Sequence, residues 1–356
     1  MTTLTGSATR PSPREHPGEP RLAAALVTPS RVATVLVIVA LALLPLFASS
    51  FTISNFSMVL IYGLAILSLD VVTGYAGQIS LGHGGLMGVG AYTTALLVTD
   101  AGLSPYLALL VAPCAAALLG LVFAVSALRL SGMYLALATF ALALTVPQFA
   151  KHFEEQTGGT QGMAVAGLSA PTAAMDPGIW TYWVILVVAT IAFALTRLFL
   201  GGRVGRALGS VRDSQLAATV CGVNVNRVKI IAFFVSSLLA GLAGALLALF
   251  MAYVSPDPFS FTLSLALFIG LGVTGVRSLA TPLVGGIILV YLPLVAGEVF
   301  RGKPDIVYGA IIVLLVLLGR GGIIDIVKRL VAHVRWTLSE SGRRGSKAAE
   351  PQPEKG

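Results

Sequence analysis

Charge is scarce in this sequence: 11% of its 356 residues are charged, whereas 56% are hydrophobic. Soluble domains typically carry roughly a quarter of charged residues, so this composition excludes most soluble folds. Disorder of the whole chain is excluded too, because so much apolar surface would not stay solvated. The few charges gather in three segments, at residues 1–31, 200–229 and 320–356. This distribution predicts an integral membrane protein with polar ends and one polar internal loop.

Cysteine is nearly absent as well, with Cys114 in an apolar stretch and Cys221 in the internal loop. Two isolated cysteines without Cys-x-x-Cys spacing argue against a disulfide framework and against a zinc site. The sequence also lacks the motifs Gly-x-x-x-x-Gly-Lys-[Ser/Thr], His-Glu-x-x-His and Gly-x-Ser-x-Gly. We therefore expect no ATP site, no metal site and no catalytic residues in this chain.

Long apolar runs dominate what is present. A membrane-crossing helix needs about 20 mostly apolar residues, and helices are required because backbone polar groups find no water in hydrocarbon. The stretches that qualify are residues 32–48, 56–73, 80–98, 104–128, 132–150, 179–199, 229–253, 262–281, 283–300 and 304–319. The predicted fold class is all-α, a polytopic transmembrane helical bundle of about ten spans over residues 32–319. A Pro-rich disordered tail is expected at 1–31, and a basic cytoplasmic tail at 320–356.

The distribution of Lys and Arg predicts the orientation in the membrane. With the N-terminus in the cytoplasm, 19 of the 23 basic residues fall in cytoplasmic segments or tails, while three fall outside. Both termini are therefore expected in the cytoplasm. This orientation puts loop 151–178 outside and loop 200–229 in the cytoplasm. Long loops between otherwise closely spaced helices are usually functional, so partners are expected at these two loops.

The cytoplasmic loop contains a candidate helix at Val211–Val220, followed by Gly222, a residue type common just past a helix end. A helix that lies across the cytoplasmic surface before a new span suits a subunit on which a motor protein pushes. The alternative is a solvated connector. The residue pattern by itself does not choose between the two.

Several segments resemble one protein family. Gln215-Leu216-Ala217-Ala218-x-x-x-Gly222 resembles the Glu-Ala-Ala-x-x-x-Gly coupling loop of bacterial ABC importer permeases. The segments that resemble branched-chain amino acid permeases are Gly74–Tyr92, Leu128–Thr139, Thr157–Gly162, Lys229–Leu246 and Tyr253–Phe261. The resemblance covers about residues 55–320 and is to the longer of the family's two permease subunits, the LivM type.

The resemblance implies a permease subunit of an ABC importer for branched-chain amino acids in a bacterial or archaeal plasma membrane. The implied partners are a homologous second permease subunit, two ATPase subunits that bind ATP and magnesium, an external substrate-binding protein and the lipid bilayer, without nucleic acid. No cofactor is expected in this chain. Relatives that carry urea, short amides or other amino acids share these motifs, so the substrate stays open. A self-sufficient secondary carrier is a further alternative, for which Asp70 and Glu298 are the plausible intramembrane charges.

Three positions depart from the family pattern. Gln215 stands where the family often has Glu, although Asp213 keeps an acid nearby. Asp70 stands where the family usually has Asn. The family's Gly-Gly-x-Gly-Ser run reads G-V-T-G-V-R-S in this chain, near residues 270–278.

Three groups of candidate site residues follow. Glycines within 74–90 allow a helix to unwind, and the freed backbone groups can bind a zwitterion, whereas close packing of helices is the alternative interpretation. The predicted substrate-pathway residues are Gly77, Gln78, Ser80, His83, Tyr134 and Thr139. For His83 a structural hydrogen bond is the favoured role, and Tyr134 and Thr139 are expected to face the interior.

The other two groups lie in the long loops. The residues predicted to couple to the ATPase are Arg212, Asp213, Gln215, Ala217, Ala218 and Gly222. The residues predicted to dock the binding protein are Glu154, Glu155, Thr157, Gly158 and Gly159. An ordinary solvated loop is the alternative for this last group.

Overall fold

The computed structural model describes residues 29–130, 132–171, 175–277, 280–299 and 309. The chain divides into two units, Met1–Leu41 and Ala42–Gly356. Helix α1 (Pro29–Phe47) begins in the first unit. The predicted tail 1–31 is wrong at its last three residues, because Pro29 starts this helix and the first helical turn tolerates proline. The rest of that tail lies outside the described residues.

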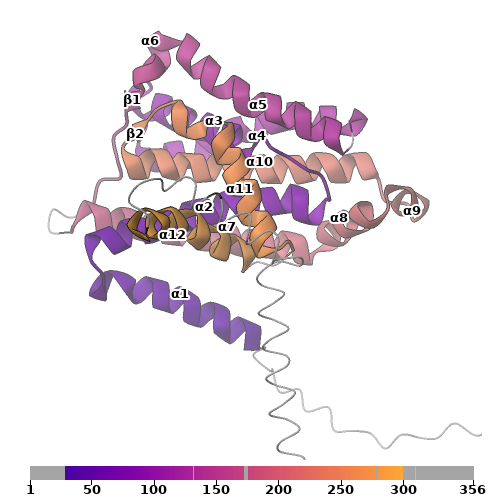
Figure 1. Ribbon diagram of the computed structural model, residues 1–356, viewed down its shortest axis with the longest axis horizontal. Helices are drawn as coiled ribbons and strands as arrows, with labels where there is room; N and C mark the ends of the chain where they lie inside the picture. The colour runs from indigo at the N-terminus through magenta and orange to yellow at the C-terminus, as the bar shows by residue number, and fades with distance from the viewer. Residues whose placement is uncertain (1–28, 131, 172–174, 278–279, 300–308, 310–356) are drawn as a thin grey trace, which may run out of the picture. The chain divides into compact units, whose positions relative to one another are not determined.

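The second unit is helical almost throughout its described part (Figure 1). Its longer helices are α2 (Ser50–Leu69), α3 (His83–Thr99), α4 (Pro105–Arg129), α5 (Met133–His152), α7 (Pro177–Gly201), α8 (Arg203–Asp213), α10 (Val225–Met251), α11 (Phe261–Thr274) and α12 (Thr281–Val299). Its short elements are the π-helix η1 (Asp70–Tyr75), α6 (Glu154–Thr157), the 3-10 turns η2 (Gly159–Gln161) and η3 (Asp257–Phe259), α9 (Gln215–Val220), and the antiparallel strands β1 (Met163–Ala164) and β2 (Tyr253–Val254).

Several of these helices suit a membrane. Among the described residues, five helical segments are long and apolar enough to cross one: Ser50–Tyr75, Pro105–Ser126, Met133–His152, Pro177–Gly201 and Val225–Met251. The shorter apolar helices are Leu36–Phe47, Phe261–Thr274 and Thr281–Gly297. The prediction of an all-α membrane bundle is therefore confirmed. The predicted span 304–319 lies outside the described residues apart from residue 309, and the total of about ten crossings stays a prediction.

Some predicted boundaries are wrong. The stretch 262–281 is not one helix, because α11 ends at Thr274 and Gly275 follows with a φ of 99°. Loop 200–229 is mostly helical, and α10 begins at Val225 because the Asn224 side chain accepts the Arg227 N–H at 3.1 Å and caps the helix. The candidate helix 211–220 is broken at Ser214, whose backbone is extended and whose hydroxyl caps α9.

Loop 151–178 is also shorter than predicted, and its described part contains short helical and strand elements. Helix α5 continues to His152, and α7 already begins at Pro177, with the Asp176 carboxylate accepting the Gly178 N–H at 2.8 Å. Between them lie α6, η2 and β1. The strand β1 joins this loop to β2, because Met163 pairs with Val254 and Ala164 with Tyr253.

Helix α10 lies at the centre of the second unit and packs against α2, α3 and α4. Glycines set how closely these helices approach. A Cβ on Gly90 would overlap the backbone of Gly241, and one on Gly244 would overlap the backbone of Met87. Such contacts between small residues are how helices pack in membranes. Close packing is therefore confirmed for this part of the glycine-rich stretch.

We expect Gly244→Val to destabilise the protein strongly, because overpacking costs about 1–3 kcal/mol even where side chains can adjust, and here the clash is with backbone. Gly272→Val is the matched control, since no described residue has an atom within 4 Å of the Cβ position at Gly272. The melting temperature of each variant is measured in detergent as the temperature at which the monodisperse fraction of the protein is lost. Equal melting temperatures for the two would contradict the packing described.

Two ends of the unit are defined by α10. Each helical residue rises about 1.5 Å, so the 27 residues of this helix span about 40 Å. Helices α8 and α9 precede its first residue and form what we name the α9 end. Strand β2 follows its last residue, and with α6 and β1 it forms the strand end (Figure 1). The two long loops therefore lie at opposite ends, as the predicted orientation requires.

Candidate functional site

The segment 70–82 is the main break in helical structure between α2 and α3. Helix α2 runs directly into the π-helix η1, in which the N–H of Ala76 donates to the carbonyl of Val71 at 3.2 Å. Gly77 then adopts a φ of 68°, and the chain stays non-helical until α3 begins at His83. Single π-turns within helices are frequent at functional sites. The predicted unwinding is confirmed for residues 76–82, while a substrate role for them stays a prediction.

A hydrogen-bonded chain of buried side chains holds the end of this break. His83 Nε2 lies 2.7 Å from the Ser236 hydroxyl of α10, and that hydroxyl donates to the carbonyl of Ser68 at 2.6 Å. Because Ser236 has one hydroxyl hydrogen and gives it to Ser68, His83 must donate from Nε2. Its Nδ1 then accepts from the Ser80 hydroxyl at 3.1 Å. Both ring nitrogens are engaged, which agrees with the favoured structural role of His83.

Thr139 fixes the other side of the break. Its hydroxyl accepts the N–H of Leu81 at 2.9 Å, and its side chain is 2% exposed, so it faces the interior as predicted. Tyr134 is 71% exposed, so its side chain does not face the interior of this chain, and its pathway role stays a prediction. The reason for this orientation is helical phase: five residues turn a helix by about 500°, which leaves the two side chains about 140° apart.

Gln78 is the pathway candidate whose polar atoms are free. Its side chain is 7% exposed, and within the described part of the chain neither its amide nitrogen nor its amide oxygen has a hydrogen-bond partner. Buried amide groups normally have partners. Its own backbone is fixed, because its N–H donates to Val72 at 3.0 Å and its carbonyl accepts from Thr73 at 3.1 Å. Among the predicted pathway residues, Gln78 is therefore a buried side chain with both a donor and an acceptor unpaired within the described part of the chain.

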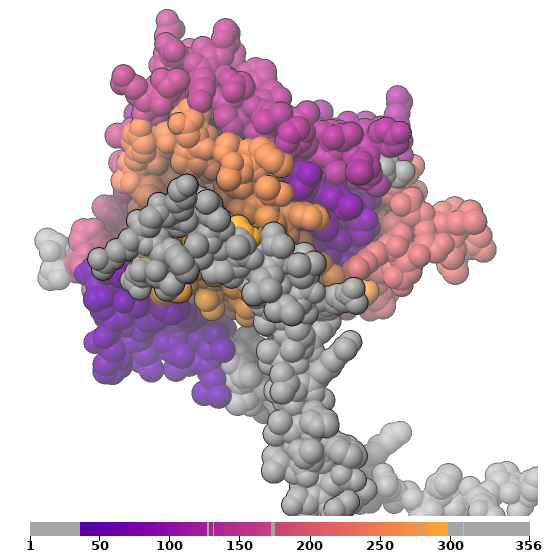
Figure 2. Space-filling view, viewed as in Figure 1, coloured from indigo at the N-terminus to yellow at the C-terminus, as the bar shows by residue number. Residues whose placement is uncertain are grey.

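The predicted coupling residues lie at the α9 end, which projects from the unit in Figure 2. Ala218 is 2% exposed and belongs to an apolar cluster that also contains Val211 of α8. Gly222 follows the end of α9 with a φ of 80°, as predicted for a residue past a helix terminus. Every other member of the group is exposed: Arg212, Asp213, Gln215, Ala217 and Gly222. The guanidinium of Arg212 nevertheless donates to the carbonyl of Gly74.

Two exposed apolar side chains on α9 were missed as site residues. Leu216 is 79% exposed and Val220 is 83% exposed, and their i, i+4 spacing puts them on one face of the helix. The small buried Ala218 lies between them in sequence and packs the opposite face of α9 against the bundle. Exposed apolar side chains paired at the tip of a projecting helix form a surface suited to protein contact. The spacing of Leu216 and Val220 was the available signal in the sequence.

The predicted docking residues lie at the strand end and fall into two kinds. Glu154 and Glu155 are exposed. Thr157 is 8% exposed, and its hydroxyl donates to the carbonyl of Phe153 at 2.8 Å. Gly158 and Gly159 take positive φ angles of 72° and 58°. Thr157 and the two glycines therefore shape this loop, and the two glutamates form its charged surface.

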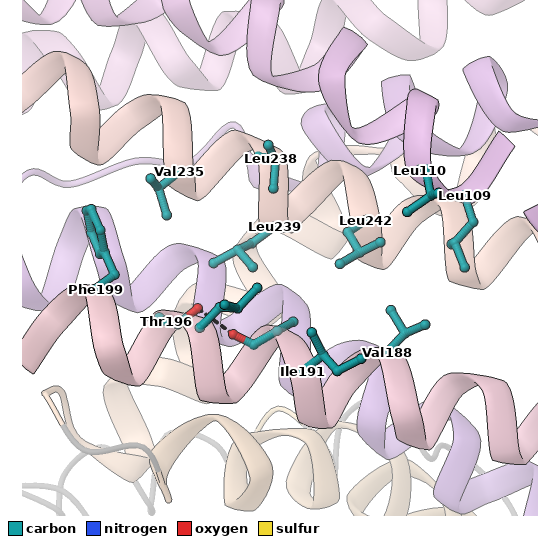
Figure 3. Close-up of a pocket in the computed structure, with 12 residues that line it drawn as sticks. Leu109, Leu110, Val188, Ile191, Thr196, Phe199, Val235, Leu238, Leu239 and Leu242 are labelled. Atoms are coloured by element: carbon teal, nitrogen blue, oxygen red, sulfur yellow. Dashed lines mark hydrogen bonds between the residues drawn. The ribbon is translucent and has the colours of Figure 1, made fainter. Parts of the chain in front are cut away.

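An apolar groove lies between α4, α7 and α10, with a volume of about 390 Å³ (Figure 3). Its lining residues are Leu109, Leu110, Val188, Ile191, Ala192, Leu195, Thr196, Phe199, Val235, Leu238, Leu239 and Leu242. The hydroxyl of Thr196 already donates to the carbonyl of Ala192 at 2.8 Å. The groove thus offers no free polar side chain to a zwitterion and does not suit an amino acid.

Metal ligands do not cluster in this structure. Within the described residues, no group of three or more His, Cys, Asp or Glu side chains lies in a position to hold a metal ion. The polar groups at the break are mainly hydroxyl, amide, imidazole and backbone groups. Of these, the Gln78 amide has no partner among the described residues, and an amide suits the binding of a neutral or zwitterionic molecule by hydrogen bonds.

Comparison with known proteins agrees with these features. A family model described as "Branched-chain amino acid transport system / permease component" matches residues 51–318. The permease protein LivM of the high-affinity branched-chain amino acid transport system of Escherichia coli K12 is 31% identical over 241 residues, which cover 61% of this chain and 57% of LivM.

Other relatives extend the comparison. LivM of Salmonella typhimurium is 30% identical over the same shares of both chains. The permease protein LivH of Salmonella typhimurium is 24% identical over 292 residues, covering 74% of this chain and 91% of LivH. This chain spans about 57% of the length of the LivM relatives that it matches. No solved structure matches the chain.

Proposed function

The chain belongs to the family of branched-chain amino acid transport system permease components, and from this premise we propose that it is the LivM-type permease subunit of an ABC importer. One observation carries the proposal. Two surfaces suited to partners lie at opposite ends of the 27-residue helix α10, and a broken helix is packed against that helix. The broken helix carries the buried amide of Gln78, which has no partner within the described part of the chain.

The proposed mechanism is alternating access. A binding protein delivers substrate at the strand end, where Glu154 and Glu155 are exposed. ATPase subunits bind ATP and magnesium themselves and act on α9, so this chain needs no nucleotide site. Neither partner can shift the transporter between its states unless it binds one state better than the other. The break at 70–82 is the segment whose rearrangement opens or closes the pathway.

The proposed assembly contains this chain, a homologous second permease subunit, two ATPase subunits and the external binding protein. The lipid bilayer is the bacterial or archaeal plasma membrane. The excess of Lys and Arg in the tails and at the α9 end supports cytoplasmic termini and about ten crossings. No cofactor and no nucleic acid enter this proposal.

The proposed substrates are branched-chain amino acids. The positive end of the α3 dipole favours a carboxylate near His83, and the Gln78 amide offers both a donor and an acceptor to a zwitterion. Urea and short amides are the second candidate class, because an amide such as Gln78 also pairs with them. Calorimetry of the binding protein with leucine, valine, isoleucine and urea distinguishes the two classes.

The proposal is tested in proteoliposomes. The complete complex of two permease subunits, two ATPase subunits and binding protein is expected to accumulate leucine when ATP is supplied. This chain reconstituted alone is expected to transport nothing. Uptake by the chain alone, driven by a proton or sodium gradient, would show a secondary carrier and overturn the proposal.

Gln78→Met is expected to raise the KM for uptake about tenfold, the equivalent of one or two lost hydrogen bonds, because methionine keeps the volume and removes the amide. Stability should change little, since the amide has no partner among the described residues. Gln148→Met is the matched control, because Gln148 is an exposed glutamine on α5, outside the break and the two partner surfaces. Initial uptake rates over a range of leucine concentrations provide the test, and an unchanged KM for the Gln78 variant would remove that residue from the pathway.

A further inference from the structure

Two arginines from distant parts of the chain contact the π-helix η1. Arg212, in the last turn of α8, donates from Nη1 to the carbonyl of Gly74. Arg277, which follows α11, donates its backbone N–H to the Asp70 carboxylate at 3.1 Å. The π-helix is therefore held at both its first turn and its last turn by residues from outside the α2–α3 segment.

Arg212 also packs against Gly77, in the non-helical part of the break. A Cβ on Gly77 would lie 2.7 Å from Cγ of Arg212 and 3.4 Å from its Cα, so the stem of this arginine lies directly over the Gly77 backbone. The φ of 68° at Gly77 is one that side-chain-bearing residues rarely adopt. Arg212 thus binds the last turn of η1 with its guanidinium and covers the backbone of Gly77 with the aliphatic part of its side chain.

Arg277 connects the same π-helix to α8. Its φ of 65° is unusual for a residue other than glycine, so its surroundings must hold it there. Its guanidinium lies over the Tyr75 ring, 5.9 Å from the centroid, and its charge interacts with that of Asp70. A terminal nitrogen of Arg277 also lies 3.5 Å from the Cβ position of Gly209 in α8.

The α9 end and the break share one apolar cluster. Val72 and Ala76 of the break pack with Val211 of α8 and Ala218 of α9 in this cluster. Arg212 lies two residues before Ser214, whose hydroxyl caps α9 by accepting the Ala217 N–H at 3.2 Å. A displacement of α9 therefore acts directly on both the cluster and Arg212.

We propose that Arg212 is a positioning residue that transmits displacement of α8 and α9 to the break at 70–82. The contact between Asp70 and Arg277 is a second attachment that holds the first turn of the π-helix. This inference rests on the proposed function, because the displacement comes from the ATPase subunits. In one state Arg212 holds the Gly74 carbonyl and the Gly77 backbone. In the other it withdraws with α8, and residues 76–82, which carry Gln78, are released.

The transport test uses the complete complex in proteoliposomes. Arg212→Ala is expected to lower uptake at least about tenfold, the effect of losing one hydrogen bond to a charged group, while ATP hydrolysis stays within about twofold of the wild type. Arg206→Ala is the matched control, since Arg206 is exposed on the same helix. Arg212→Lys retains charge and a donor but not the planar fork, so its uptake should lie between the two. Equal uptake per ATP for the Arg212 and Arg206 variants would overturn the proposal.

A second readout does not depend on transport. In the full chain in nanodiscs, with Cys114→Ser and Cys221→Ser, the Ile79→Cys substitution puts a thiol on the released segment, where Ile79 is 41% exposed. Adding Arg212→Ala or Arg212→Lys is expected to change the maleimide labelling rate severalfold, and Arg206→Ala is expected to leave it unchanged. A change in labelling without transport by the wild-type complex would reject the proposed function and retain the positioning role. Normal transport by the wild-type complex, together with labelling rates that are identical for the Arg212 and Arg206 variants, would reject the positioning role alone.

Discussion

Replacing both Leu216 and Val220 by aspartate is expected to abolish ATP-dependent uptake and to release the ATPase subunits from the complex. The two side chains are 79% and 83% exposed in this chain, so the substitutions remove no packing within it. Burying each one under a partner contributes about 1.5–3 kcal/mol, so losing both weakens the contact by roughly two to four orders of magnitude. Placing two carboxylates in an apolar contact adds a desolvation penalty.

Co-purification of the ATPase subunits through a tag on this chain measures the effect. Asn226→Asp is the control, because it adds an acid at an exposed position near the same end without removing apolar surface. The double variant should remain monodisperse and keep the melting temperature of the wild type when purified alone. Full retention of the ATPase subunits by the double variant would remove α9 from the proposed coupling surface.

Gly77→Val is expected to lower uptake about a hundredfold or more. Two effects combine at this position: a β-branched residue is strongly disfavoured at a φ of 68°, and its Cβ would lie 2.7 Å from Cγ of Arg212. Either the break or the arginine must move. Each adjustment of this kind typically costs 1–3 kcal/mol, so together they move an equilibrium by about two orders of magnitude or more.

Gly102→Val separates the two effects. Gly102 has a nearly equal φ of 63°, but no atom of the described residues lies within 4 Å of its Cβ position. The control should therefore show the loss of stability caused by backbone strain and retain uptake once folded protein is compared at equal amounts. If both variants lost uptake equally, the contact between Gly77 and Arg212 would have no special role.

The sequence predicted the long helices well where their ends carry clear chemical signals. Ser104 and Pro105 start α4, within a residue of the predicted span 104–128, as expected for a capping side chain followed by proline. Helix α7 has the same signal in Asp176 and Pro177 and begins two residues before the predicted span 179–199. Helix α2 did not end at a comparable signal. It continues as a π-helix through Tyr75, and hydropathy contains no information on whether a backbone bond reaches four or five residues back.

The contact between Asp70 and Arg277 could not have been predicted from the sequence. In the sequence, Asp70 and the run that contains Arg277 are two separate departures from the family pattern. The residues are 207 positions apart, and only the fold brings the Arg277 N–H to the Asp70 carboxylate. The two departures therefore form one local arrangement in this chain.

The candidate site also combines features that local sequence determines with features that only tertiary packing determines. Local sequence predicted that glycines would break a helix near Gly77 and that Gly222 would end one, because both effects depend on backbone conformation at a single residue. Local sequence did not predict which polar groups stay free. His83 pairs with Ser236 of α10 and with the neighbouring Ser80, and Thr139 of α5 accepts from Leu81 in the break. The Gln78 amide has no partner among the described residues, and this difference depends mainly on tertiary packing.

The central claim is that partners at the two ends of α10 act on each other through this chain. The most direct measurement is ATP hydrolysis by the complete complex in nanodiscs, titrated with substrate-bound binding protein. The account predicts a saturable, severalfold rise in hydrolysis that disappears in the Leu216→Asp, Val220→Asp variant and is weakened by alanine at Glu154 and Glu155. A hydrolysis rate that does not respond to the binding protein, in a complex that still takes up leucine, would contradict it.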